Sequence, residues 1–289
     1  MLDYITGEKL QELTDHTIVL YGQEYVTEQL KNINTPFTYF NPNIPITELS
    51  ENIQNAKSLY VYIHKLDFFF NNIYPLRKKP FILMTHNYDS DVTEKYQKFL
   101  DDPKIIKWFS VNVNYQHPKL ISIPIGIANS QWPHGNLNIL EKIRNENNHK
   151  TMLVYKNFDI STAVHRRQHV HEATDRNGIY MAPRKPHIEY LRDISKSYFT
   201  ICPMGNGIDS HRVWESLYLN TIPIVPDCIH FQGFKELPIL PVINGEYDNW
   251  QHITIPLLQS ALEKMSKVKY DNSKLRLEYW KKQIKHEPI

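Results

Sequence analysis

The sequence is poor in several features that would set a protein apart from an ordinary folded chain. Of its 289 residues only two are cysteines, Cys202 and Cys228, which argues against a disulfide framework and favours a reducing compartment. No apolar run approaches the roughly 18 residues that a membrane-spanning helix needs. Lys and Arg number 33 and Asp and Glu 31, a balance that predicts no general attraction to nucleic acid or anionic lipid.

Signals for export are also missing. The first eight residues contain no basic region followed by an apolar stretch, so we expect no signal peptide. There is no Asn-x-Ser/Thr acceptor for glycosylation. These absences favour a cytoplasmic protein.

Short β-branched runs alternate with amphipathic stretches in the first half of the chain. The amphipathic stretches predict helices at 23–33, 46–56 and 92–101, with Asp91 as the N-cap of the last. This alternation predicts βαβ units and a mainly parallel sheet. The strands that we expect are Thr17–Tyr21, Ser58–Ile63, Phe81–Thr85, Trp108–Val113 and Leu120–Ile125.

The polar stretch 145–150 is expected to link this part to a second α/β unit. The tail from about 254 is expected to be helical throughout, with Pro256 in a first turn. In the second unit we expect strands at Met152–Tyr155, Phe199–Cys202 and Ile222–Val225, and helices at 161–174, 186–196 and 210–219. The sequence therefore predicts two Rossmann-like domains, 1–148 and 149–269, with a ligand cleft between the carboxyl edges of their sheets.

The densest polar cluster, residues 202–215, lies between two predicted strands. The chain has only nine glycines, yet Gly205 and Gly207 both fall here, and glycine permits close approach of a ligand. Asp209 or Ser210 would cap the following helix. The free N–H groups and positive dipole at such a helix start favour a diphosphate.

Polar side chains open that helix. Arg212 can hold phosphate oxygens bidentately, and Glu215 can accept hydrogen bonds from ribose hydroxyls. An ordinary β-loop-α connection is the alternative. Ser210 stands where the dinucleotide fingerprint has its third glycine, and there is no Walker A sequence.

The run 199–225 resembles the signature of exostosin-like glycosyltransferases, Cys-Pro-x-Gly, then Arg-x-x-Glu-Ala, then Gly-Cys-Ile-Pro-Val. Ser216 replaces the usual alanine, and Asn220-Thr221 replace Gly-Cys. The matching residues include Gly205, Arg212, Glu215 and Pro223.

Looser similarity at 118–127 and 157–159 is typical of members encoded by large DNA viruses and some bacteria, and a viral protein would act in the host cytoplasm. The resemblance implies a GT-B fold, with an acceptor domain first, a nucleotide-sugar domain second, and a C-terminal helix (270–289) crossing back to the first. It also implies inverting transfer, without an essential metal or cofactor, from a UDP-sugar such as UDP-xylose to an oligosaccharide or glycoprotein glycan.

Further donor-site candidates lie near the start of the second unit. Cations here can reach the diphosphate in a GT-B donor site, although a solvated helix face is the alternative for Arg166 and Arg167. His165 and His169 are spaced as zinc ligands, but Arg166 stands where the metalloprotease pattern has Glu, so no metal is expected. The predicted donor-binding residues are Lys156, Asn157, Arg166, Gly205, Asn206, Gly207, Asp209, His211, Arg212 and Glu215.

Inverting transfer needs a general base that removes the proton of the acceptor hydroxyl. The loop after the strand expected at 81–85 offers Asp89, which we favour, and also His86 and Asp91. The rivals after the strand expected at 58–63 are His64 and Asp67.

Trp132 offers an aromatic face for a sugar ring, with interdomain packing as the alternative. Two other functions stay open. One is a non-catalytic nucleotide-sugar or glycan-binding protein. The other, a nucleotide-dependent oxidoreductase or epimerase, is disfavoured by the missing third glycine and by the lack of a Tyr-x-x-x-Lys pair in a suitable helix.

Overall fold

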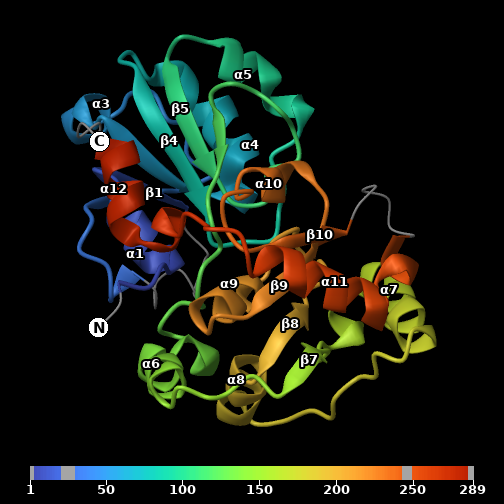
Figure 1. Ribbon diagram of the computed structural model, residues 1–289. Coiled ribbons are helices and arrows are strands. Elements are labelled where there is room, and N and C mark those ends of the chain that lie inside the picture. Colours follow the sequence, from blue (N-terminus) through green and yellow to red (C-terminus); the bar gives the residue numbers. More distant parts are fainter. Residues whose placement is uncertain (1–2, 21–29, 243–248, 286–289) are drawn as a thin grey trace. The chain divides into compact units, whose positions relative to one another are not determined.

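The computed structural model describes residues 3–20, 30–242 and 249–285. The chain divides into two compact units. The first unit comprises Ile5–Gly135 and Arg276–Ile289, and the second comprises Met1–Tyr4 and Asn136–Leu275. Each is an α/β unit built on its own parallel sheet (Figure 1). The helix predicted at 23–33 falls largely on 21–29, outside the described residues.

The first unit contains a six-stranded parallel sheet of order β2-β1-β3-β4-β5-β6. Its strands are β1 (His16–Leu20), β2 (Phe37–Phe40), β3 (Ser58–Tyr62), β4 (Phe81–His86), β5 (Ile105–Ser110) and β6 (Leu120–Ser122). The predicted parallel sheet is confirmed. The strand order changes direction between β1 and β3, and ligands of open α/β sheets bind outside the strand ends at such a switch point.

One strand of this sheet was not predicted. β2 is four residues long and only partly buried, at the edge of the sheet, so it lacks the apolar alternation of a half-buried strand. In contrast, β1, β3 and β4 are buried along their whole length. That burial explains the continuous apolar runs by which the sequence revealed them.

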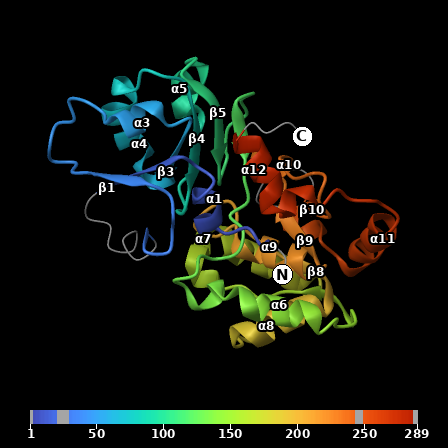
Figure 2. The ribbon, with the colours of Figure 1, turned by 90° about the vertical axis from the view of Figure 1, so that its left-hand side faces the viewer.

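The helices of the first unit within the described residues are short. They are α1 (Gly7–Gln11), α3 (Glu51–Asn55), α4 (Leu66–Phe68), α5 (Gln97–Asp101) and α12 (Leu277–Lys285). The last helix packs beside α1, as Figures 1 and 2 both show.

The predicted cap at Asp91 is wrong, because the helical segment before α5 begins at Glu94 with Thr93 as N-cap. Asp91 instead accepts a hydrogen bond from Asn114 Nδ2 (3.3 Å).

The second unit contains a four-stranded parallel sheet of order β10-β9-β8-β7. Its strands are β7 (Met152–Tyr155), β8 (Ser197–Ile201), β9 (Ile222–Pro226) and β10 (Leu240–Val242). Its helices are α6 (Leu137–Asn145), α7 (Val164–Arg176), α8 (His187–Ser195), α9 (His211–Tyr218), α10 (Ile229–Gln232) and α11 (Ile255–Met265). Pro256 lies in the first turn of α11, but the tail is not helical throughout, because 266–272 separate α11 from the next helical turn.

The predicted linker at 145–150 lies inside the second unit. Here α6 packs on α8. Arg192 of α8 binds both carboxylate oxygens of Glu146 at 2.8 Å, and Asn148 Nδ2 donates to Ser195 Oγ at 3.1 Å. The polar stretch is therefore the surface of a helix pair, and the boundary between the units lies earlier, at Gly135–Asn136.

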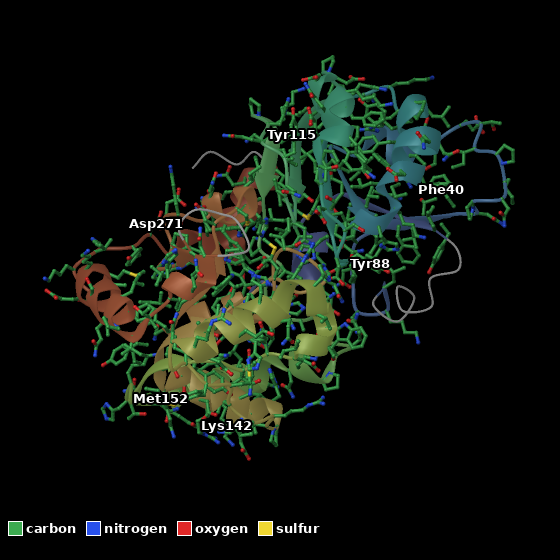
Figure 3. The ribbon with its side chains drawn as sticks, turned by 90° about the vertical axis from the view of Figure 1, so that its right-hand side faces the viewer. Phe40, Tyr88, Tyr115, Lys142, Met152 and Asp271 are labelled. Carbon is green, nitrogen blue, oxygen red and sulfur yellow. The ribbon has the colours of Figure 1, made fainter. Side chains whose placement is uncertain are left out.

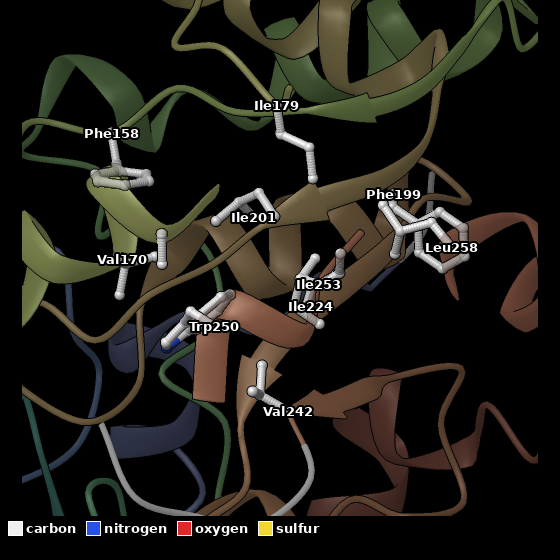
Figure 4. Packing of buried hydrophobic residues seen from close by; sticks show 11 residues of the cluster. Phe158, Val170, Ile179, Phe199, Ile201, Ile224, Val242, Trp250, Ile253 and Leu258 are labelled. Atoms are coloured by element: carbon white, nitrogen blue, oxygen red, sulfur yellow. The ribbon is translucent and has the colours of Figure 1, made fainter. Parts of the chain in front are cut away.

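A compact apolar core supports the second sheet (Figure 4). Phe199 and Ile201 of β8 and Ile224 of β9 pack against side chains of α7, α11 and the segment 250–253. Each large apolar side chain buried in this way contributes roughly 1.5–3 kcal/mol to folding. The core fixes the strands and so fixes the loops that leave their carboxyl ends.

No helix in the described ranges is both long and apolar enough to cross a membrane.

Candidate functional site

The loop 202–210 joins the carboxyl end of β8 to α9. Gly205 N–H donates to Gly207 O (3.0 Å), which closes the loop on itself. Ser210 is the N-cap, with extended dihedral angles (φ −141°, ψ 146°), and α9 begins at His211. The predicted helix start is confirmed. The free N–H groups of its first turn lie at the N-terminal end of the helix, which is the end that favours anions.

Two adjacent arginines of α7 hold this loop. Arg166 Nη1 donates to the carbonyl oxygens of Gly205 and Asn206, both at 2.9 Å. Arg167 Nε donates to Met204 O at 2.9 Å. A Cβ on Gly205 would lie 2.9 Å from Arg167 Nη2, so glycine permits the close approach. Arg166, predicted to reach the diphosphate, is thus chiefly a residue that positions the loop.

Arg212 is a third arginine near this loop. It is half-buried in the first turn of α9, and its guanidinium carbon lies 5.7 Å from the centre of the Tyr190 ring. Its Nε has no hydrogen-bond partner among the described residues. Burial opposes its charge, but neighbouring groups, Tyr190 foremost, outweigh burial and raise the pKa.

A second cation lies close to Arg212. The pKa of Arg167 falls to about 10, first because the side chain is buried and then because of the charge of Arg212. Two guanidinium groups that disfavour each other in this way create a local positive potential. An anion bound here would relieve it, and the planar guanidinium of Arg212 suits a phosphate group.

Glu215 lies one turn further along α9, and its carboxylate is held from α8. Its Oε1 is 3.2 Å from His187 Nε2, and its Oε2 accepts from the Tyr190 hydroxyl at 2.9 Å. Burial would raise the pKa of Glu215, but the hydrogen bonds and charge of its partners, His187 first, prevail and lower it. An ionised carboxylate accepts about four hydrogen bonds, so acceptor capacity remains for ligand hydroxyls.

His187 and Tyr190 were not predicted. Their rings are nearly parallel, with centres 5.9 Å apart. They lie 28 and 25 residues from Glu215 in sequence, and only the packing of α8 on α9 brings them to it. The one sequence signal was two ring side chains three residues apart at the start of the helix expected at 186–196.

Lys156 and Asn157 leave the set of ligand-binding residues. The Lys156 ammonium is buried and donates to His171 O and Ile179 O at 3.0 Å and to the Asp175 carboxylate. All three of its N–H donors are therefore used within the protein. Asn157 Nδ2 donates to Pro183 O (2.9 Å) and so fastens the segment before α8.

Asp209 is a buried anchor of the loop. Its Oδ1 accepts from Ser210 N–H at 2.8 Å. Its Oδ2 accepts from Trp214 Nε1 at 2.8 Å and lies 3.2 Å from His230 Nε2. We therefore assign Asp209 to holding the start of α9. Of the other predicted contacts, Asn206 is exposed and His211 is half-buried.

The first unit places the candidate bases in different surroundings. His86 is buried, with Nε2 3.0 Å from Pro124 O and Nδ1 2.9 Å from Asn87 Oδ1. Asp67 accepts from the Tyr96 hydroxyl (2.8 Å), which lowers its pKa. Asp89 is exposed and has no hydrogen-bond partner among the described residues. Of the predicted carboxylate bases, Asp89 is thus the one that no described side chain engages.

The sequence also singled out Trp132 and the histidine pair His165 and His169. Trp132 is 50 % exposed, and its ring stacks on that of His134 with centres 6.2 Å apart. His165 is exposed and His169 half-buried. Within the described ranges, no group of three or more His, Cys, Asp or Glu residues is arranged to hold a metal ion.

The sequence matches no protein-family model and no curated protein. The fold and the residues define an α/β protein with two parallel sheets, in which three arginines, Arg166, Arg167 and Arg212, lie near the loop that follows β8.

Proposed function

We propose that this protein is an inverting glycosyltransferase that binds the diphosphate of a nucleotide-sugar at Arg212 and the loop 203–210. The observation that carries the proposal is the state of Arg212. It is a half-buried guanidinium in the first turn of a helix, beside a second arginine that its charge perturbs. A bound diphosphate would accept hydrogen bonds from this guanidinium and offset the mutual repulsion of the two arginines.

In this reaction negative charge develops on the departing diphosphate. The acceptor oxygen attacks the anomeric carbon while the bond to the diphosphate breaks, and the leaving group takes the bonding electron pair. Arg212 and the N–H groups at the start of α9 would stabilise that developing charge. Asp89 would take the acceptor proton. A GT-B arrangement of the two units is part of this proposal.

Glu215 is proposed to bind the ribose. Glu215 is 5 % exposed, and its contacts with His187 and Tyr190 fix its orientation. An ionised carboxylate can accept about four hydrogen bonds, a capacity that suits two neighbouring hydroxyl groups. The donor is then a nucleotide with a ribose and a diphosphate, for which a UDP-sugar such as UDP-xylose is our choice. The acceptor would be a glycan hydroxyl.

Replacing Arg212 by alanine tests the donor site. We expect the affinity for UDP to fall about 10-fold or more, because a charge-assisted hydrogen bond is worth roughly 1.5–3 kcal/mol. Calorimetric titration of the full chain with UDP measures this. Arg176→Ala is the matched control, because it removes the same charge from the exposed far end of α7. Equal affinity in folded Arg212→Ala and wild type would remove Arg212 from the site.

A further inference from the structure

The loop after β4, residues 87–91, displays an aromatic ring (Tyr88, labelled in Figure 3). Tyr88 is 49 % exposed, and its ring packs on the imidazole of His64 with centres 4.2 Å apart. His64 follows β3, which pairs with β4 so that Tyr62 lies opposite His86. The two rings therefore lie at the carboxyl edge of the first sheet, beside its switch point.

The backbone beneath this ring is firmly held. Asn112 is fully buried, and its Nδ2 donates to the carbonyl oxygens of Tyr88 (3.3 Å) and Ser90 (3.4 Å). Asn87 adopts a left-handed conformation (φ 62°), and its Oδ1 accepts from Asn129 Nδ2 at 3.1 Å. A loop fixed in this way loses little conformational entropy when a ligand binds.

The partner ring is uncharged at neutral pH. Burial, with a smaller contribution from the charge of Lys65, lowers the pKa of His64 to about 4. The imidazole therefore supports Tyr88 as a neutral ring. Desolvating such a pair under a ligand carries no cost of burying a charge.

We propose that the ring pair Tyr88–His64, here called the aromatic platform, binds a pyranose ring of the acceptor glycan. This role rests on the proposed glycosyltransferase function. The C–H groups on one face of a pyranose carry partial positive charge and suit the negative face of an aromatic ring. Next to Tyr88 in the loop, Asp89 is exposed and Ser90 is half-buried, and both side chains can bind the sugar hydroxyls.

The surroundings favour a sugar over a protein partner. A stable protein interface requires a broad surface of about 800 Å² on each side with an apolar centre. Here the loop 87–91 displays one half-exposed ring, followed in sequence by the exposed carboxylate of Asp89 and the half-buried hydroxyl of Ser90. One aromatic face with polar neighbours suits one pyranose ring.

Saturation-transfer NMR on the full chain tests the platform without any donor. The probes are methyl β-D-glucopyranoside, methyl β-D-galactopyranoside and methyl β-D-xylopyranoside. We expect at least one to bind, and Tyr88→Ala to weaken binding about fivefold or more, as truncation of an aromatic hot spot does. Tyr88→Phe, which keeps the ring, should bind like wild type. So should Tyr198→Ala, which removes another exposed tyrosine at the amino-terminal end of β8.

Three results would overturn the platform: no binding of any of the three glycosides, unchanged binding by folded Tyr88→Ala, or a loss in Trp132→Ala that Tyr88→Ala does not share. The UDP titration of Arg212→Ala addresses the other unit and reports separately on the donor. Tyr88-dependent glycoside binding without UDP binding would therefore uphold the platform while refuting the transferase.

Discussion

An Asp89→Asn variant is expected to transfer sugar roughly 10²–10⁴ times more slowly, as kcat, because it loses the general base of the reaction. UDP affinity should be unchanged, since Asp89 belongs to the first unit and Arg212 to the second. Side-chain shape is kept and Asp89 is exposed, so we expect the melting temperature to stay close to that of wild type. Steady-state kinetics measures kcat, a UDP titration measures the affinity, and a thermal melt gives the melting temperature.

Matched substitutions identify the base. Asp91→Asn should retain most of kcat, because Asp91 is held by Asn114. His64→Gln should raise the KM for the acceptor, because His64 supports Tyr88 in the platform, but it should lower kcat far less than Asp89→Asn does. His86→Asn should mainly lower stability, because both ring nitrogens of this buried residue lie within hydrogen-bond distance of protein groups. If Asp89→Asn transferred sugar at a near-normal rate, and kcat instead fell strongly in one of the other three variants, the base would be misassigned.

Removing the buried carboxylate of Asp209 is expected to destabilise the protein by about 3–5 kcal/mol, as breaking one side of a buried polar pair does. The change deprives Trp214 Nε1 of its acceptor and removes the carboxylate beside His230 Nε2. Both partner side chains are fully buried, so water cannot replace the lost bonds. Denaturant unfolding of Asp209→Ala measures the loss.

Asp209→Asn is the matched control for this change. Its remaining oxygen can still accept from Trp214, so it should lose clearly less stability than the alanine variant. A loss below about 1 kcal/mol in Asp209→Ala, within the usual range of surface substitutions and weak contacts, would contradict the anchoring role.

The sequence predicted the elements whose signals are local. The strand at Met152–Tyr155 was expected with the bounds that the structure has, because its apolar residues stand between polar stretches. The start of α9 was readable from its capping residue and glycine-rich loop. Strand β10 was not, because it is only three residues long and contains Pro241, which breaks the usual strand pattern.

Side-chain roles were harder to predict because they depend on tertiary packing. Lys156 and Arg212 are both cations near strand ends, yet the acceptors on α7 and the segment after it consume every donor of Lys156. Nothing local in the sequence distinguishes the two. Likewise, the partners of Glu215 come from α8, a different helix, and their proximity exists only in the folded protein.

The most direct test of the central claim is turnover of a panel of UDP- and GDP-sugars, with the three methyl glycosides as acceptors. The account predicts that at least one UDP-sugar releases UDP, that the product carries the inverted anomeric configuration by NMR, and that Arg212→Ala abolishes most of the release. UDP binding without turnover of any sugar would point instead to a non-catalytic nucleotide-sugar-binding protein. Absence of both UDP binding and turnover, or a product with retained configuration, would contradict the account.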